Sequence, residues 1–164
     1  MSSSSLAGRS AVVITVSDRC FRDEQSDLSG PAVVAALREA GMEAIECAVL
    51  PDEQPQLEAA LREAAKHAAL IVTTGGTGLA ERDVTPEATL AVCERLVPGL
   101  AELMRQDGAR HTPYAALGRG VCGVCGRALV LNLPGSPAGA KSSLLAVLPL
   151  LSHALNLLAG ETAH

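Results

Sequence analysis

The stretch LIVTTGGTGLAERDVTPEAT, residues 70–89, contains the pattern that decides the fold. It starts with a short apolar run, which is typical of a strand buried on both faces of a parallel sheet. It ends with Thr85 and Pro86, which we expect to be the N-cap and the first residue of a helix. A polar loop with three glycines lies between the two. The stretch therefore predicts a strand, a flexible loop and a helix in that order.

Other segments of the chain repeat these strand and helix patterns. AVVITV (11–16) and ALVLNL (128–133) are continuous apolar runs, and AIECAVL (44–50) alternates more, which indicates a strand nearer the edge of the sheet. Ser29 and Pro31 mark the start of the first predicted helix. Helices are predicted over residues 29–41, 53–68, 83–97, 98–108 and 136–160.

Strands and helices alternate along the chain, without repeats or a long linker. This order predicts one α/β domain over residues 9–160, with a mostly parallel sheet covered by helices on both faces. Residues 1–8 are expected to form a flexible leader, and Pro149 is expected to kink or divide the last helix. Residues 110–127 are rich in glycine and show no pattern that assigns them to an element.

Composition excludes several classes of function. The chain has 164 residues, a net charge of −5, and only Phe21 and Tyr114 as aromatic residues. The negative charge and the lack of stacking side chains argue against a nucleic-acid partner. No apolar run approaches the roughly 18 residues of a membrane span, so we expect no membrane partner and a cytoplasmic protein.

The five cysteines and four histidines give no catalytic or metal-binding motif. Cys122 and Cys125 form a CGVC pair, but a structural zinc site needs about four ligands and no second pair completes the set. We therefore expect free thiols in a reducing compartment. The histidines are scattered and none pairs with a serine or cysteine nucleophile, so no covalent mechanism is indicated.

Four polar loops follow the predicted strands. They are SDRC (17–20), PDEQ (51–54), GGTGLAERD (75–83) and PGSP (134–137). In a parallel α/β sheet, ligands bind beyond the carboxyl ends of the strands. The four loops are therefore expected to meet at one rim.

Gly75, Gly76 and Gly78 allow positive φ angles, and successive N–H groups in such a loop can form an anion-binding nest. A tight turn without a ligand is the alternative for this motif. Ser136 is expected to cap the last helix, whose N-terminus can also receive a phosphate.

Two acidic residues lie on the loops of this predicted rim. Asp52 and Asp83 could each be a turn or capping residue. Because they follow different strands beside a phosphate nest, they also suggest a Mg²⁺ site, since Mg²⁺ is bound by carboxylates together with substrate phosphates.

The segment GSPAGAKS, residues 135–142, nearly matches the P-loop pattern of nucleotidases, with Ala140 in place of the final glycine. Pro137 after a serine cap would place Lys141 well inside the helix, where it could not curl over a phosphate. No further strand follows the segment. The P-loop interpretation is therefore the weaker one.

The chain resembles the MoaB/Mog family of molybdenum cofactor biosynthesis, which includes the G domain of gephyrin. The resemblance covers about residues 9–159 and is most specific at GGTG followed by DVTPEAT. Supporting motifs occur in the family's order: VSDRC, DLSGP, PDEQ, PGL, LGRG and LVLNLPGSP. It implies a three-layer α/β sandwich, a homotrimer or hexamer, and binding of molybdopterin, a pterin with a dithiolene and a terminal phosphate.

The PDEQ motif is similar to the adenylyltransferase branch of the family. That branch transfers AMP from ATP to the phosphate of molybdopterin with Mg²⁺, releases pyrophosphate, and works beside a molybdenum-insertion enzyme. By this resemblance, Asp52 and Asp83 would be the catalytic and metal-binding pair. The residues that would bind nucleotide or pterin are Ser17, Asp18, Gly75, Gly76, Thr77, Gly78, Arg82, Pro134, Gly135 and Ser136.

One position departs from the family pattern. Many relatives carry a basic residue near the second cysteine of GVCG, where this chain has Cys125. If that charge contacts a substrate phosphate, Arg119 or Arg127 would have to replace it here. A molybdopterin-binding carrier without adenylylation activity is the alternative function.

Overall fold

The computed structural model describes residues 5–161, which form a six-stranded sheet in the order β2-β1-β3-β6-β5-β4. Strands β2, β1, β3 and β6 are parallel, whereas β5 runs antiparallel to both β6 and β4. The predicted mostly parallel sheet, with its alternating strand at the edge, is confirmed. The strands are β1 (Ser10–Val16), β2 (Ala44–Leu50), β3 (Leu70–Thr74), β4 (Arg95–Leu96), β5 (Cys122–Cys125) and β6 (Ala128–Leu133).

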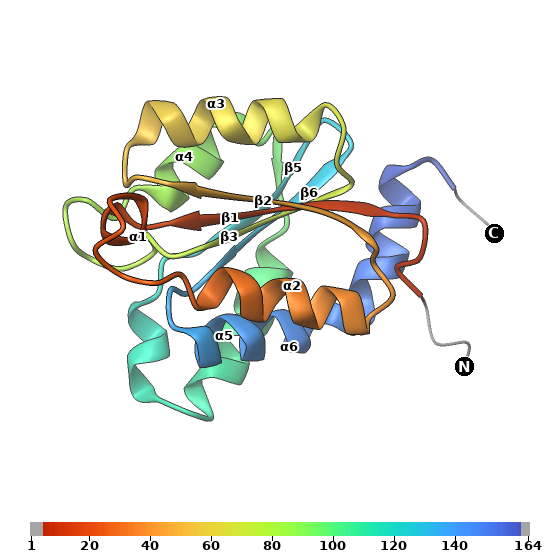
Figure 1. Ribbon diagram of the computed structural model, residues 1–164. Helices are drawn as coiled ribbons and strands as arrows, with labels where there is room; N and C mark the ends of the chain where they lie inside the picture. The colour runs from red at the N-terminus through yellow and green to blue at the C-terminus, as the bar shows by residue number, and fades with distance from the viewer. Residues whose placement is uncertain (1–4, 162–164) are drawn as a thin grey trace.

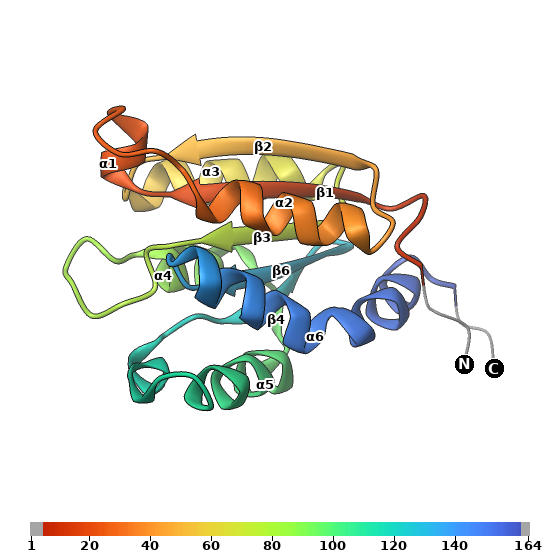
Figure 2. The ribbon, with the colours of Figure 1, turned by 60° about the horizontal axis from the view of Figure 1, so that its bottom comes forward.

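Helices cover both faces of the sheet, as predicted. Helices α3 and α4 lie on one face, and α2, α5 and α6 lie on the other (Figures 1 and 2). The three layers match the expected sandwich. The helices are α1 (Asp18–Phe21), α2 (Ser29–Glu39), α3 (Gln54–Ala65), α4 (Thr85–Val92), α5 (Pro98–Ala109), the short 3-10 helix η1 (Pro113–Leu117) and α6 (Pro137–Leu158).

Alternate side chains of the central strands enter two separate cores. On β3, Leu70 and Val72 face the core under α2, α5 and α6, whereas Ile71 faces the core under α3 and α4. All three side chains are fully buried, and each such burial stabilises the fold by about 1.5–3 kcal/mol. This double packing fixes the register of β3 and thus the position of the loop that follows it.

Short elements were not predicted from the sequence. Strand β5 lies within the unassigned residues 110–127, and β4 occupies part of the predicted helix 83–97, which ends at Val92 instead. The chain leaves that helix because backbone pairing to β5 replaces helical hydrogen bonds: Glu94 N–H donates to Val124 O at 3.0 Å. Neither β4 residue is buried, so no apolar pattern marks this strand.

Helix α6 runs unbroken through Pro149, so the proline does not divide it, although the helix bends in its second half (Figure 2). Among the described residues, α6 is the one helix long and apolar enough to cross a membrane by length and composition. Its inner side chains, including Leu144, Val147 and Leu151, lie in the protein core. Burial in a core explains the apolar stripe.

The packed structure begins earlier than predicted. Leu6 lies in the segment expected to be a flexible leader, but its side chain is buried and its N–H donates to Ala40 O at 3.2 Å. The guanidinium of Arg9 donates to Asn156 at 2.6 Å and to Glu161 at 3.0 Å. These contacts hold the two ends of the described chain side by side. Residues 1–4 of the expected leader lie outside the described residues.

Candidate active site

The four loops after the parallel strands meet at the carboxyl edge of the sheet, on the left in Figure 1. The chain goes from β1 to β2 on one side of β1 and then crosses to β3 on its other side. The order of the strands thus reverses at β1, and α/β sheets bind ligands at such a topological switch point. Backbone hydrogen bonds there join two of the loops to the ends of neighbouring strands. Ser17 N–H donates to Leu50 O at 2.9 Å, and Gly75 N–H donates to Leu133 O at 3.1 Å.

Asp18 and Asp52 tie the first two loops together by a reciprocal pair of hydrogen bonds. The N–H of Asp18 donates to Oδ2 of Asp52, and the N–H of Asp52 donates to Oδ1 of Asp18, both at 2.9 Å. Asp52 therefore does not cap the following helix, α3, which has no side-chain cap. Ser17 accepts a hydrogen bond from Cys20 N–H and caps the short helix α1.

The environment of Asp52 disfavours its charge. Burial raises the pKa of the Asp52 carboxyl above its ordinary value, and the nearby carboxylates of Asp18 and Asp83 raise it further. The hydrogen bond from Asp18 N–H and the charge of Arg82 act in the opposite direction. A carboxylate that is partly desolvated and close to others is typical of a cation-binding or catalytic position.

The glycine loop requires glycine for steric reasons. Gly75 and Gly76 have φ angles of +93° and +68°. A Cβ on Gly75 would collide with the carbonyl oxygen of Val16, and one on Gly76 would collide with the hydroxyl of Thr85. The loop thus passes so close to β1 and α4 that only a bare backbone fits.

Thr85 does not cap helix α4, contrary to the prediction. The N-cap position is Val84, and the buried Thr85 hydroxyl donates instead to Gly75 O at 3.0 Å. The N–H of Thr85 donates to Gly76 O at 3.1 Å. The positive φ angles turn two loop carbonyls toward Thr85, which satisfies both of them.

Asp83 closes the far end of the same loop. Its Oδ2 accepts a hydrogen bond from Ala80 N–H at 3.0 Å and lies 2.8 Å from the position that a Cβ on Gly78 would occupy. Among residues 5–161, neither Asp52 Oδ1 nor Asp83 Oδ1 accepts a hydrogen bond. The turn-forming role and a binding role are therefore compatible, because each carboxylate keeps one oxygen for a ligand.

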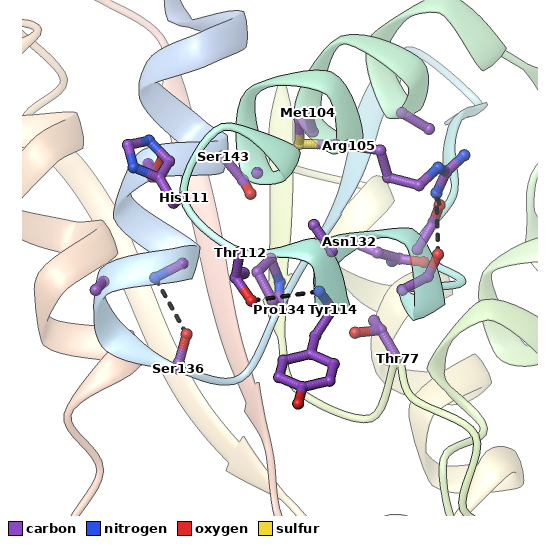
Figure 3. Close-up of a pocket in the computed structure, with 18 residues that line it drawn as sticks. Thr77, Met104, Arg105, His111, Thr112, Tyr114, Asn132, Pro134, Ser136 and Ser143 are labelled. Atoms are coloured by element: carbon purple, nitrogen blue, oxygen red, sulfur yellow. Dashed lines mark hydrogen bonds between the residues drawn. The ribbon is translucent and has the colours of Figure 1, made fainter.

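Two hollows flank the glycine loop. The larger, of about 530 Å³, lies between α5, η1, the start of α6 and the end of β6 (Figure 3). Thr77 and Ser136 reach this pocket, whereas Gly75 and Gly135 line the smaller hollow of about 170 Å³ between the ends of β1 and β3. The glycine and PGSP loops therefore form the wall between them. Gly135 approaches the Gly75 backbone closely: a Cβ on Gly135 would lie 3.3 Å from Gly75 Cα.

The larger pocket has an apolar lining with a polar floor. Met104 and Pro134 contribute apolar surface. Asn132 lies at the floor, where its amide donates to the hydroxyls of Thr73 and Thr89 at 3.0 Å each. A volume of this size is ordinary for a small-molecule site, and such sites combine apolar walls with a few placed polar groups.

The start of α6 borders both hollows. Ser136 caps this helix, as predicted, and accepts a hydrogen bond from Gly139 N–H at 3.1 Å. The amide groups at this helix N-terminus provide a partial positive charge that suits a phosphate. Lys141 is exposed within the helix and no strand follows among the described residues, which agrees with the argument against a P-loop.

Most of the predicted site residues thus meet at one rim. Arg82 is the exception because it is exposed on the outer part of the loop, although its charge acts on Asp52. The residues brought together are Ser17, Asp18, Asp52, Gly75, Gly76, Thr77, Gly78, Asp83, Pro134, Gly135 and Ser136.

Neither arginine suggested as a substitute for a basic residue at Cys125 is free to replace it. Cys125 pairs with Ala128 at the start of β6, so Cys125 and Arg127 lie at the amino edge of the parallel strands, opposite the rim. The guanidinium of Arg119 lies at the rim, but its donors are taken by Glu87 and by loop carbonyls. The groups left to attract anions at the carboxyl edge are backbone N–H groups, a helix N-terminus, Arg82 and Arg105, which lines the larger pocket.

Residues 5–161 contain no group of three or more His, Cys, Asp or Glu side chains arranged to hold a metal ion. Asp52 and Asp83 still fit a Mg²⁺ ion that shares its ligands with substrate. Both are carboxylates on one rim, each with an oxygen left open, and Mg²⁺ at phosphate sites is commonly held by one or two carboxylates plus phosphate and water.

The CGVC cysteines point away from each other. They are three residues apart on β5, so Cys122 joins the core under α2, α5 and α6, and Cys125 joins the core under α3 and α4. Burial raises the pKa of Cys122, and also that of Cys93, to about 12. This geometry does not suit a shared zinc ion or an internal disulfide.

We expect alkylation at neutral pH to modify Cys47 first, because it is exposed, and to leave Cys93 and Cys122 unmodified until the protein unfolds. The thiolate is the reactive form and their pKa values suppress it. Peptide mapping after timed exposure to iodoacetamide measures this order. Early labelling of Cys122, or stoichiometric zinc found by elemental analysis, would contradict it.

Comparison with known proteins agrees with this geometry. A family model described as "Probable molybdopterin binding domain" matches residues 12–153. The chain belongs to this molybdopterin-binding domain family. Its match to a molybdopterin adenylyltransferase of Helicobacter pylori strain J99 is 38% identical over 153 residues and covers 91% of this chain and 87% of that protein.

Other members of the family are also similar. The molybdopterin biosynthesis enzyme MoaB from Thermus thermophilus is 52% identical, with a TM-score of 0.86, and the match covers 93% of this chain and 97% of the other. The Drosophila melanogaster molybdenum cofactor synthesis protein cinnamon is 39% identical over 155 residues, which are 92% of this chain but 26% of cinnamon. The predicted family and fold are confirmed.

Several residues that shape the site were not predicted as such. Ser29 begins helix α2, as predicted, and its hydroxyl is also bonded to that of Thr74 at 2.8 Å, across to β3. Asp27, two positions before the helix, accepts a hydrogen bond from Gly30 N–H in the first turn and another from the hydroxyl of Thr15. An acidic residue just before a predicted helix was the signal that could have identified this contact.

Proposed function

We propose that this protein is a molybdopterin adenylyltransferase. In this reaction an oxygen of the molybdopterin phosphate attacks the α-phosphorus of ATP, and the bond from that phosphorus to pyrophosphate breaks. Relatives with this name, 38–42% identical to the chain, support the assignment. The observation that carries it is the rim itself, where one glycine loop separates two hollows beside two carboxylates.

The proposed reaction brings two anionic groups together, so catalysis consists mainly of positioning and charge stabilisation. The larger pocket, with its apolar walls, suits the flat heterocycle of a substrate. The remaining N–H groups of the glycine loop and of the start of α6 would bind phosphate oxygens. No nucleophile from the protein is required, because the substrate phosphate is the attacking group.

Asp52 and Asp83 would hold a Mg²⁺ ion together with the phosphates of ATP. When bound, the ion would neutralise the charge on the transferring phosphoryl group. Asp18 would keep Asp52 in place through their reciprocal hydrogen bonds. The raised pKa of Asp52 is consistent with this role, because a bound cation would stabilise the ionised carboxylate that burial and, to a smaller extent, the neighbouring carboxylates disfavour.

The test is direct. Purified protein is incubated with molybdopterin, ATP and MgCl₂, and both pyrophosphate and adenylyl-molybdopterin are measured by chromatography. Formation of both in equal amounts supports the proposal. Tight molybdopterin binding without either product would indicate a carrier, and absence of binding would contradict both functions. Omission of MgCl₂, with EDTA added, should abolish turnover if the metal assignment is right.

We further propose that the protein works as a homotrimer in the cytoplasm and passes its product to a molybdenum-insertion enzyme. The domain leaves large apolar side chains exposed, among them Leu90, Leu96, Leu145, Leu150 and Leu157. Covering such side chains in a subunit interface would stabilise the assembly. Light scattering is expected to give about three times the chain mass of 16.8 kDa, or six times for a hexamer. A clean monomer at micromolar concentration would contradict this expectation.

A further inference from the structure

The segment after η1 contains an arginine that touches the glycine loop at several points. The Nε of Arg119 donates to Gly78 O at 2.7 Å, and one terminal nitrogen donates to Asp83 O, also at 2.7 Å. Its own backbone N–H donates to Thr77 O at 2.9 Å. One residue therefore holds three carbonyl groups of the loop, at both ends of the segment 77–83.

A carboxylate on α4 fixes the guanidinium in place. Arg119 forms a two-point ion pair with Glu87, with N–O distances of 2.8 and 3.1 Å. The segment that carries Arg119 is held in turn by Arg105 of α5, which donates to Gly120 O at 2.8 Å and Gly118 O at 3.4 Å. The glycine loop is thus connected to two helices through planar guanidinium groups, which bind two acceptors at fixed angles.

These contacts bear on both halves of the proposed site. Thr77, at one end of the clamped segment, lines the larger pocket, and Asp83, at the other end, is one of the two rim carboxylates. We propose that Arg119, held by Glu87, is a positioning residue that keeps Asp83 and the glycine loop aligned with the larger pocket for the transfer reaction. This inference rests on the adenylyltransferase function proposed above.

The pair is partly exposed, with 35% of the Arg119 side chain and 39% of the Glu87 side chain accessible to solvent. Exposed ion pairs contribute little to global stability. Loss of the pair should therefore loosen the loop without unfolding the protein. A group that orients a metal-binding carboxylate typically changes activity by about 10- to 100-fold when it is removed.

The experiment compares Arg119→Gln, Arg119→Lys and Glu87→Gln with the wild type. Hydrogen exchange measured by mass spectrometry should become faster in peptides covering 77–83 and remain unchanged in β1 and β3. We expect kcat to fall by about 10- to 100-fold in the two glutamine variants, with a smaller change in KM. Lysine keeps the positive charge but lacks the planar guanidinium with its several donors, so kcat of Arg119→Lys should lie between that of Arg119→Gln and that of the wild type. Arg38→Lys is the matched control, because Arg38 also donates to a carbonyl, that of Glu43, far from the rim.

Several results would overturn the inference. Unchanged exchange over 77–83 in both glutamine variants would show that Arg119 does not hold the loop. Faster exchange throughout the protein, with kcat per folded molecule unchanged, would show a general structural role. A raised KM for one substrate with an unchanged kcat would indicate direct substrate contact. If the wild type makes no product, the adenylyltransferase proposal and the catalytic part of this inference fail together, while the exchange experiment still tests whether Arg119 holds the loop.

Discussion

Substituting Asp52 or Asp83 by asparagine is expected to lower kcat by about 10²-fold or more, because each change removes a charge placed to stabilise the transition state. Asparagine keeps the size of the side chain and an oxygen that can accept the hydrogen bond from Asp18 N–H or Ala80 N–H. The rim should therefore keep its shape. Steady-state kinetics with varied MgCl₂ should show a weaker metal dependence in both variants. Wild-type turnover in both would exclude these residues from the metal site.

The pKa of Asp52 makes two further expectations specific. Because this pKa lies above the ordinary value of a carboxyl group before a metal binds, kcat/KM, which reports the free enzyme, should fall at a higher pH on acidification than an ordinary carboxylate would give. A raised pKa in the folded state also means that the ionised group opposes folding above that pKa. Asp52→Asn should therefore unfold at a slightly higher temperature than the wild type at pH 7. This difference should vanish at low pH, where the carboxyl of the wild type is protonated in both states.

Substituting Gly75 by alanine is expected to reduce both stability and activity. The φ angle of +93° is unfavourable for alanine and costs about 1–3 kcal/mol, and the collision of the new Cβ with Val16 O adds to this value. The collision also pushes the glycine loop away from β1, so the loop would no longer close the wall between the two hollows. Urea unfolding measures the free energy change, and the pyrophosphate assay measures turnover.

Gly99→Ala is the matched control for this substitution. Gly99 lies in α5, and a Cβ there would meet nothing within 4 Å. Alanine should raise stability by up to about 1 kcal/mol because it is the better helix former. Equal effects of the two substitutions would show that the Gly75 conformation is not what the loop depends on.

The parts of the fold predicted from sequence are those that bury continuous apolar runs. Strand β3 is recognisable because each of its residues is buried by one of two helix layers. Strand β5, with the sequence CGVC, was not recognised because it is only four residues long and contains a glycine, so its short apolar run does not stand out from the glycine-rich segment around it. The predicted loops, strand ends and helix cap at Ser136 follow local rules that need no tertiary context.

The contacts within the site were harder to predict, because they join distant parts of the chain. Thr85 fits the local pattern of an N-cap, and only the positive φ of Gly75 explains why its hydroxyl turns to the loop. Arg119 and Asp83 are 36 positions apart, so no local motif connects them. Asp18 and Asp52 meet because β1 and β2 pair in register, which brings the ends of these strands together.

The joined chain ends have a consequence for the architecture of larger proteins. The contacts of Arg9 with Asn156 and Glu161 hold the first and last described segments together at the amino edge of the sheet, opposite the glycine loop (Figure 1). A domain fused at either end would be attached on the side away from both hollows and would leave them accessible to substrate. The fold can therefore serve as a module within a multidomain chain, consistent with its match to only 26% of cinnamon.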